Sequence, residues 1–562
     1  MKKIFVYITA LASLLVFASC EKFLDVSPEG VYSTTSYFQN DEQSVNAIKV
    51  LYQNFPTEKL YGRDIFWDQC GTNMYVPGKT RGFPTLFYLA YTGDEEPLRN
   101  SFNLIYEYMK NANWIVSSLL SKCGGDTAKL TAIEKRTLGE AYFFRGYYHF
   151  LAAYRYGTPE LGVPFVRWEQ EGGYNNEIPP QLESVMKNYE WIVSDFTNAE
   201  ELLPLFKDYG AEDRGRAHKA AAVGMMARAY AFWAANVNAT DKTKWDKVIE
   251  CVNKLETTYG RELVDNYDDL FAPDWEKFWN NECIFSIPGN GGGTTDAGSM
   301  FPNVPFYNGG FEGAFNSWGQ FKPTHDLYEE FAKDNAANDP TGKNNIRLKR
   351  TILSYGDTIQ YNGKTIAFYE DKDLAVGYMC GKYREVYTRG TISEIQAAGI
   401  LGTNGDWPTM RSNFHVIRMA DCMLLRAEAY LAKGEENPKH DINAVRARVN
   451  LPAAVAEDWK ALYHERMCEF AFEPISDHLG DLRRWILIGD EPIKSLAITE
   501  LTTHPRVMKY DDRSDPSSAG TVQPYEDYKD QTAEWKEHKV VFPYPSEVLA
   551  NSAGQYKQNA GY

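Results

Sequence analysis

Beyond its first twenty residues, the sequence lacks any apolar run long enough to cross a membrane, since a spanning helix needs about 20 consecutive apolar residues. It also lacks an excess of basic residues. There are 59 lysines and arginines against 76 acidic residues, which gives a formal net charge of −17. Nucleic acids and anionic membrane surfaces attract cationic proteins, so we expect no nucleic acid partner.

Motifs for nucleophilic or metal-dependent catalysis are missing as well. His464 opens HERMCE, which departs from the metalloprotease pattern HExxH, and the nine histidines are scattered. The glycine run at 289–293 lacks the Gly-Lys-Ser/Thr of a phosphate-binding loop. We therefore expect no bound metal and no cofactor. Hydrolysis by two carboxylates stays open, because so many acidic residues can reach a glycosidase spacing by chance.

Cysteine is scarce, with eight in 562 residues and no CxxC pair. One of the eight, Cys20, belongs to the N-terminal segment, which leaves an odd number in the rest of the chain. Cys422 and Cys468 lie on helical stripes of apolar residues. Buried free thiols are therefore expected, in preference to a disulfide framework.

The N-terminal segment has the layout of a secretory signal. Lys2 and Lys3 precede the apolar run 4–17, and Ala18-Ser19 lead directly to Cys20. A basic start, a short apolar stretch and small residues before a junction are typical of such signals. A cysteine at that junction predicts a bacterial lipoprotein, with residues 1–19 removed and Cys20 acylated, for example with palmitate. The alternative is an ordinary signal peptide followed by a chance cysteine.

The stretch from 414 to 485 is the most strongly patterned part of the chain. Residues 416–431 are apolar nearly all round, which predicts a buried helix that starts with Val416, and Gly434 follows as its cap. Asp441 is expected as the N-cap of a second helix, and a third begins at Trp459. Arg418 and Arg426 must be paired if buried, and we expect their partners among Asp421, Glu428, Glu465, Glu469 and Glu473.

Helical patterns alternate with irregular stretches in the rest of the chain. Helices are expected at 100–122, 130–156, 183–203, 217–235 and 245–257, and a β-hairpin turns at 362–363. Residues 61–97 and 285–325 carry many aromatics without a sustained period, and 504–535 reads as a polar surface loop. The fold class is therefore mainly α, a tetratricopeptide-like helical repeat with long loop insertions and minor β-hairpins.

Several segments of the sequence resemble those of one protein family. RMADCMLLRAEAYLAKGE, AVRARVN, HERMCEFAFE and DLRRW are similar to the C-terminal signature of the SusD/RagB family, and FPYPSEVLANSAGQYKQNAGY resembles its usual ending. The opening EKFLDVSPEG is similar too. Members are surface lipoproteins that capture nutrients, mostly glycans. The resemblance implies an N-terminal SusD-like region at 20–330 that carries the ligand loops, and a C-terminal SusD/RagB region at 331–562.

The same resemblance implies a function. The protein is expected to be no enzyme, to bind an oligosaccharide or polysaccharide, and to deliver it to a SusC-like TonB-dependent transporter. It is expected in the outer membrane, held by a lipid anchor and facing the cell exterior. Three alternatives remain open: capture of peptides by a member of the same family, glycoside hydrolysis, and a tetratricopeptide scaffold that binds proteins.

The two irregular regions match the family's glycan-binding loops in position, at 61–91 and 303–321. We expect their rings to stack on sugar and their polar neighbours to bind hydroxyls. The expected ring platforms are Trp67, Tyr75, Tyr307 and Trp318, and the expected polar partners are Asp68, Asn73, Arg81 and Asn316. The alternative for each ring is that it anchors its loop to the core.

Ring area sets the expected affinity. One ring buries about 150–250 Å², so half of that contact contributes roughly 2–3 kcal/mol at ~25 cal/mol per Å². Two or three rings, less the cost of association, give an affinity between millimolar and micromolar. That range suits a protein that must release its ligand.

The lipoprotein interpretation predicts the behaviour of Cys20→Ala. This variant should be recovered as a soluble or uncleaved protein, because the acyl chains that hold the wild type on the membrane are missing. Membrane fractionation of cells that express both forms measures it. Unchanged partitioning of the variant would contradict the prediction.

Overall fold

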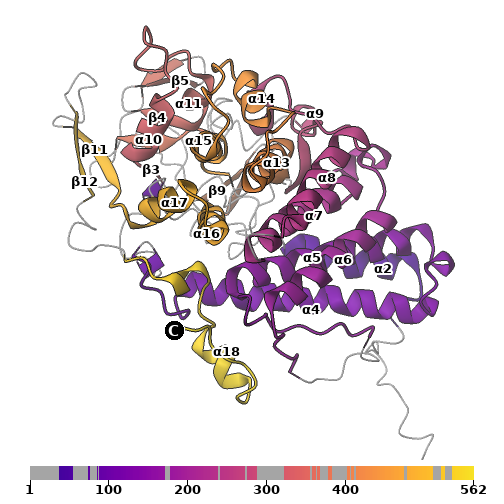
Figure 1. The fold of residues 1–562 in the computed structure, drawn as a ribbon. Coiled ribbons are helices and arrows are strands. Elements are labelled where there is room, and N and C mark those ends of the chain that lie inside the picture. The colour runs from indigo at the N-terminus through magenta and orange to yellow at the C-terminus, as the bar shows by residue number, and fades with distance from the viewer. Residues whose placement is uncertain are drawn as a thin grey trace, which may run out of the picture.

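A computed structural model describes most of the chain. The described residues are 37–54, 74–75, 85–86, 88–170, 178–237, 241–272, 275–287, 322–354, 357–361, 364–367, 377–382, 401–404, 407–410, 413–473, 478–510, 520–525 and 534–562. Figure 1 shows a helical N-terminal half, drawn in indigo to magenta, beside a mixed C-terminal half in which short strands accompany the helices.

The N-terminal half is a stack of helices in which each packs on the next along the chain. Their bounds are α2 Asp41–Asn54, α4 Glu96–Cys123, α5 Ala132–Tyr156, α6 Val185–Leu202, α7 Lys219–Asn236 and α8 Thr243–Thr257. This arrangement agrees with the predicted mainly α class and with the expected helices at 100–122, 130–156 and 183–203.

The longest helices of the stack have clear local signals. Thr131 caps α5 through a reciprocal capping box with Glu134, which satisfies two otherwise unpaired backbone donors. Gly124 ends α4 in the left-handed conformation at φ 61°, where glycine has no steric penalty. Every residue of α5 from Thr137 to Tyr156 is buried, so this helix forms the centre of the stack.

The C-terminal half contains helices of moderate length. They are α9 Trp275–Phe278, α10 His325–Ala332, α11 Ile346–Thr351, α13 Met419–Lys433, α14 Asp441–Arg448, α15 Trp459–Phe470, α16 His478–Ile488, α17 Ile493–Thr502 and α18 Ser546–Asn551. Helix α13 packs on α8 and α7, and α16 packs on α7. A single hydrophobic core therefore extends from the first described residues to Tyr544.

The strands form antiparallel pairs. These are β1 Met74–Tyr75 with β3 Lys322–Pro323, β2 Cys283–Ile287 with β10 Phe414–Arg418, β4 Ile352–Ser354 with β7 Tyr378–Cys380, β5 Thr358–Tyr361 with β6 Lys364–Ala367, β8 Leu401–Asn404 with β9 Trp407–Met410, and β11 Arg506–Tyr510 with β12 Gly520–Pro524. The β5–β6 pair, with Tyr361 opposite Lys364, confirms the expected hairpin. Its turn residues lie outside the described part.

Three local predictions were wrong. Val416 and Ile417 belong to β10 and not to a helix, because this segment pairs with β2, where Ile417 lies opposite Phe285. Part of the expected loop 504–535 forms the β11–β12 ladder. Asp441 is the first residue of α14 rather than its N-cap, and its buried carboxylate instead accepts hydrogen bonds from Arg426. The cap at Gly434 is confirmed, in the left-handed conformation at φ 70°.

A network of buried charges fills the centre of the C-terminal half. Arg418, at the end of β10, lies 2.6 Å from Glu282, 2.7 Å from Glu469 and 2.9 Å from Glu473, and all four side chains are inaccessible to solvent or nearly so. Lys382 lies 2.6 Å from Glu473. Burial opposes the charge of Glu469, yet neighbouring arginines outweigh it and hold the pKa of this carboxyl well below its usual range. The Glu469 carboxylate therefore stays ionised at neutral pH.

The charged residues Arg426 and Asp421 of α13 form ion pairs outside this network. Arg426 contacts Asp441 at 2.7 Å and Glu256 at 2.6 Å. It is therefore paired, as expected, but with neither of its partners among the five carboxylates named, although Asp441 belongs to the same 414–485 stretch. Asp421 accepts from Arg228 and Arg466, which again joins α13 to α7 and α15. The expectation for Arg418 is confirmed for Glu469 and Glu473.

The described cysteines are buried and form no disulfide among themselves, in agreement with the expectation. They are Cys123, Cys251, Cys283, Cys380, Cys422 and Cys468. Across the described ranges, the structure contains no helix with both the length and the apolarity that a membrane span requires.

The buried network predicts the effect of Arg418→Met. The free energy of unfolding should fall by about 3–5 kcal/mol, because three carboxylates are left in the core without their central partner. Denaturant titration followed by circular dichroism measures the loss. The matched control is Lys187→Met, which removes one half of a surface pair with Glu190 and should cost less than about 1 kcal/mol. Equal losses in the two variants would contradict the prediction.

Candidate functional site

The two sequence regions expected to bind ligand are joined by a pair of short strands. Tyr75 of β1 pairs with Lys322 of β3, and Met74 pairs with Pro323, in antiparallel register. Strand β1 lies within 61–91, and β3 follows directly after 303–321. Segments far apart in the sequence therefore meet at one place in the fold, beside α10 in Figure 1.

The junction of β3 with α10 is buried and hydrogen-bonded. Lys322 and Thr324 are fully buried, and the Thr324 hydroxyl accepts a hydrogen bond from the backbone N–H of Leu327 at 3.1 Å. That bond caps α10 immediately after the strand. Strand β7 also contacts β3, so the junction between the two regions is held by both a strand and a helix.

Three stacked rings lie at this junction. The rings of His325 and Tyr328 on α10 are nearly parallel to the ring of Tyr378 on β7, with interplanar angles of 25° and 22°. His325 Nδ1 lies 2.6 Å from the Tyr378 hydroxyl, and Nε2 lies 3.3 Å from Glu329. Burial lowers the pKa of His325 below its ordinary value. The neutral imidazole therefore donates a hydrogen bond from Nε2 to Glu329. Its Nδ1 accepts a hydrogen bond from the Tyr378 hydroxyl.

Hydrogen bonds and ring contacts hold this arrangement together. Tyr378 and Tyr328 both keep their hydroxyl protons, since burial raises the pKa of each phenol. Within the described ranges, no group of three histidine, cysteine or carboxylate side chains is placed to hold a metal ion. What the described residues form here is a fixed base from which the two aromatic-rich regions depart.

The individual site residues fall mostly outside the described residues. These are Trp67, Asp68, Asn73, Arg81, Tyr307, Asn316 and Trp318, together with the lipidation site Cys20. The backbone of Tyr75 is described, in β1. Its role as a ring platform remains a prediction, as do the roles of the others. His325 and Tyr378 were not foreseen, since no local pattern marks a ring stack between a helix and a distant strand.

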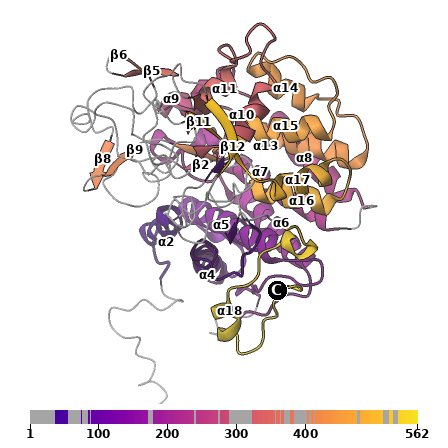
Figure 2. The same ribbon diagram turned by 90° about the vertical axis from the view of Figure 1, so that its left-hand side faces the viewer.

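A separate pocket lies between α4 and α18, which are neighbours in Figure 1 and in Figure 2. Its volume is about 420 Å³, and it is lined by residues from α4, from the segments 164–168 and 178–179, and from α18 with the residues after it. Sequence reasoning did not foresee it, because Phe102 and Tyr106 follow the helical stripe of α4 and read as core.

Two protein-family models match this chain, one in each half. The model described as "SusD family" matches residues 281–562, and the model described as "Starch-binding associating with outer membrane" matches residues 22–231. A SusD-like protein of Bacteroides ovatus is 23% identical over 479 residues, which cover 82% of this chain and 79% of that protein.

Solved structures share the fold. A SusD-like protein from Bacteroides fragilis superposes with a TM-score of 0.72 at 20% identity, covering 94% of this chain and 98% of its own. A protein described as a laminarin-binding SusD-like protein superposes with a TM-score of 0.64 at 20% identity, covering 93% of this chain and all of its own. These likenesses establish the fold class and its mainly helical character.

The β1–β3 pairing predicts a cross-link. In the double variant Met74→Cys/Pro323→Cys a disulfide should form on mild oxidation, because paired antiparallel residues have Cα atoms about 4.5–5.5 Å apart, within the range a disulfide spans. Mass spectrometry of tryptic peptides under non-reducing conditions detects it. The control Met74→Cys/Val522→Cys places the second thiol in the β11–β12 sheet and should give no linked peptide. A failure of the first pair to link would contradict the register.

Proposed function

Because the chain belongs to the SusD family, we propose that it is a cell-surface lipoprotein that captures an oligosaccharide and passes it, uncleaved, to a TonB-dependent transporter. The observation that carries this proposal is the β1–β3 pairing. It joins a point inside one aromatic-rich region to the residues that directly follow the other, as a ligand site formed by both regions requires.

Several features support glycan as the ligand class. One family model that matches this chain is described as starch-binding, and one structure of the same fold is described as laminarin-binding. Aromatic residues make up 14% of the chain, and many lie in 61–91 and 303–321. Flat rings offer apolar faces to the C–H groups of a sugar, and neighbouring Asp68, Asn73, Arg81 and Asn316 would hold its hydroxyls.

The remaining parts of the proposal concern location and handover. An acylated Cys20 anchors the protein to the outer membrane without a spanning segment. The proposed orientation is outward, with the protein seated on a SusC-like transporter. Release of the glycan to that transporter suits an affinity between millimolar and micromolar, as the ring-area argument gives.

The proposal predicts the effect of Trp67→Ala and of Trp318→Ala. Each should weaken glycan binding by roughly 1–3 kcal/mol, since most of a ring's contact surface is lost. The melting temperature should stay nearly unchanged, because a loop platform is not core. Isothermal calorimetry on soluble glycans, with laminarin and soluble starch in the panel, measures the affinity beside the wild type.

Three outcomes would count against the proposal in different ways. A large drop in melting temperature would show that the ring packs in the core. Shortened glycan products after incubation would show hydrolysis. Binding of peptides but not of any glycan would show that the chain is a peptide-capturing member of the family.

A further inference from the structure

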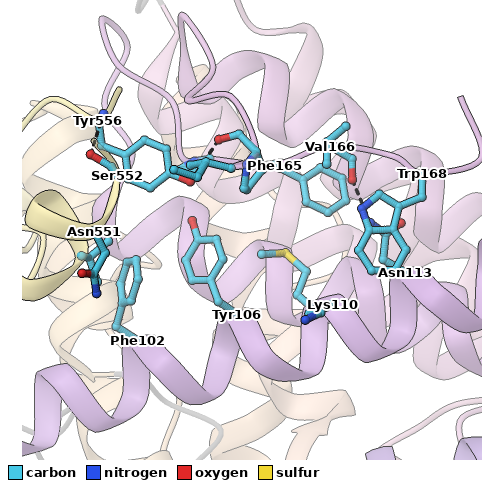
Figure 3. Close-up of a pocket in the computed structure, with 15 residues that line it drawn as sticks. Phe102, Tyr106, Lys110, Asn113, Phe165, Val166, Trp168, Asn551, Ser552 and Tyr556 are labelled. Atoms are coloured by element: carbon cyan, nitrogen blue, oxygen red, sulfur yellow. Dashed lines mark hydrogen bonds between the residues drawn. The ribbon is translucent and has the colours of Figure 1, made fainter. Parts of the chain in front are cut away.

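The pocket at α4 is assembled from segments that are distant in the sequence. Phe102, Tyr106 and Lys110 follow one another at intervals of four residues on one face of α4, as Figure 3 shows. Opposite them lie Phe165 and, further along, Trp168. The remaining wall is formed by the C-terminal residues Val548, Asn551, Ser552 and Tyr556.

The wall opposite α4 is held in place by hydrogen bonds from neighbouring helices. The side-chain amide of Asn188 on α6 brackets Val163, accepting from its N–H at 3.0 Å and donating to its carbonyl at 3.1 Å. Asn113 on α4 donates to the carbonyl of Val166 at 2.9 Å. Arg145 in turn donates to the Asn113 carbonyl oxygen at 2.9 Å. This part of the pocket is therefore formed before any ligand arrives.

The C-terminal wall is held just as firmly. The Tyr556 hydroxyl donates to the carbonyl of Pro179 at 3.0 Å. Gln181 exchanges two hydrogen bonds with the backbone of Lys557. Asn559 donates to the carbonyl of Tyr156 at the end of α5. These bonds fix the segment after α18 over α4 and close the pocket on one side.

Inside the pocket, one polar atom lacks a partner. The hydroxyl of Tyr106 is shielded from solvent, yet no hydrogen-bond partner for it exists among the described residues. Figure 3 shows this hydroxyl pointing into the space between the α4 face and the opposite wall. Burial raises the pKa of Tyr106 well above its ordinary value, so the group stays protonated and able to donate. A buried hydroxyl without a partner is destabilising, and a bound acceptor relieves that cost.

Next to that hydroxyl lie the apolar faces of several rings. Phe102 and Tyr106 stack at 4.6 Å with an interplanar angle of 29°, and Phe165 is held from behind by Trp191 and His149. The volume of about 420 Å³ is near the lower limit of small-molecule sites, which is about 300 Å³. The pocket therefore has room for one or two sugar rings but not for a long chain.

We propose that this pocket is a second carbohydrate site, which takes a single neutral pyranose unit with one hydroxyl oxygen accepting from Tyr106. The sugar's C–H face lies against the Phe102–Tyr106 and Phe165 rings, and its remaining hydroxyls face Asn551 and the mouth beside Lys110. This inference relies on the proposed function for the source of the sugar. The pocket itself is separate from the β1–β3 base.

The test separates the pocket from the loop site by using the double variant Trp67→Ala/Trp318→Ala as background. The probes are the methyl glycosides of glucose, galactose, mannose and N-acetylglucosamine, measured by saturation-transfer NMR titration. At least one glycoside should bind in this background at millimolar concentration. Adding Tyr106→Phe should weaken it by about five- to tenfold, the worth of one hydrogen bond. Adding Val548→Trp, which fills the pocket from α18, should abolish it.

A matched control distinguishes binding from folding. Tyr230→Phe removes a hydroxyl from α7, where the ring stacks on Trp233 outside the pocket, and should leave glycoside binding unchanged. The melting temperature of the Tyr106→Phe variant should be equal to or higher than that of its parent, because a hydroxyl without a partner is lost. A marked fall in that temperature would show that the hydroxyl is part of the fold, and would overturn the proposal.

Other outcomes overturn the proposal as clearly. If no glycoside binds in the double-variant background, or if Tyr106→Phe has no effect on the binding observed, the pocket is not a sugar site. If phenylalanine amide binds there and the glycosides do not, its ligand is an aromatic side chain. Failure of the proposed function is distinguished separately, since it appears as a lack of binding to laminarin, starch and the other long glycans by the wild type.

Discussion

The buried ion network around Arg418 is the interaction on which the C-terminal half depends. Its charges come from the end of β10, from Glu282 just before β2, and from α15 with the residues that follow it. Lys382 contributes from the end of β7. A charge in a low-dielectric core is costly unless its partners are present. These elements therefore stabilise one another's positions in the folded protein.

The same network positions the candidate ligand site. Lys382 comes two residues after β7, and its ammonium group also donates to the backbone carbonyl of Glu469 at 2.7 Å. Tyr378 in β7 hydrogen-bonds to His325, which follows β3. Strand β3 in turn pairs with β1. A series of contacts thus connects the charged core to the β1–β3 pair. The position of that pair is therefore fixed by the core.

The sequence was informative where a signal is local. The periodic apolar residues and the cap at Gly434 placed the helices well, and the surplus of charge on α13 correctly indicated buried ion pairs. The sequence could not identify Glu282 as a partner of Arg418 or Glu256 as a partner of Arg426, because these residues meet only through tertiary packing. Strand β10 was read as helix because its need for β2 as a partner is not visible locally. Strands β11 and β12 were not predicted because neither shows the alternation of buried and exposed residues that is typical of a strand.

The two candidate sites escape sequence reasoning for related reasons. Strands β1 and β3 have two residues each, too few for any periodicity. In the pocket, Tyr106 follows the same stripe as true core residues of α4. Only the C-terminal segment, brought over α4 by Tyr556 and Asn559, turns that face into the wall of a cavity. The resemblance to the family gave the loops by position but says nothing about this second pocket.

The short β1–β3 pair has an evolutionary consequence. Because β1 holds one aromatic-rich region from within and β3 holds the residues that follow the other, insertions elsewhere in these regions leave the helical stack and the charged core untouched. Lengthening a flexible loop is inexpensive, since each doubling of its length costs only about 0.6 kcal/mol in closure entropy. Selection can thus alter these two segments while the rest of the gene remains under constant selection for folding.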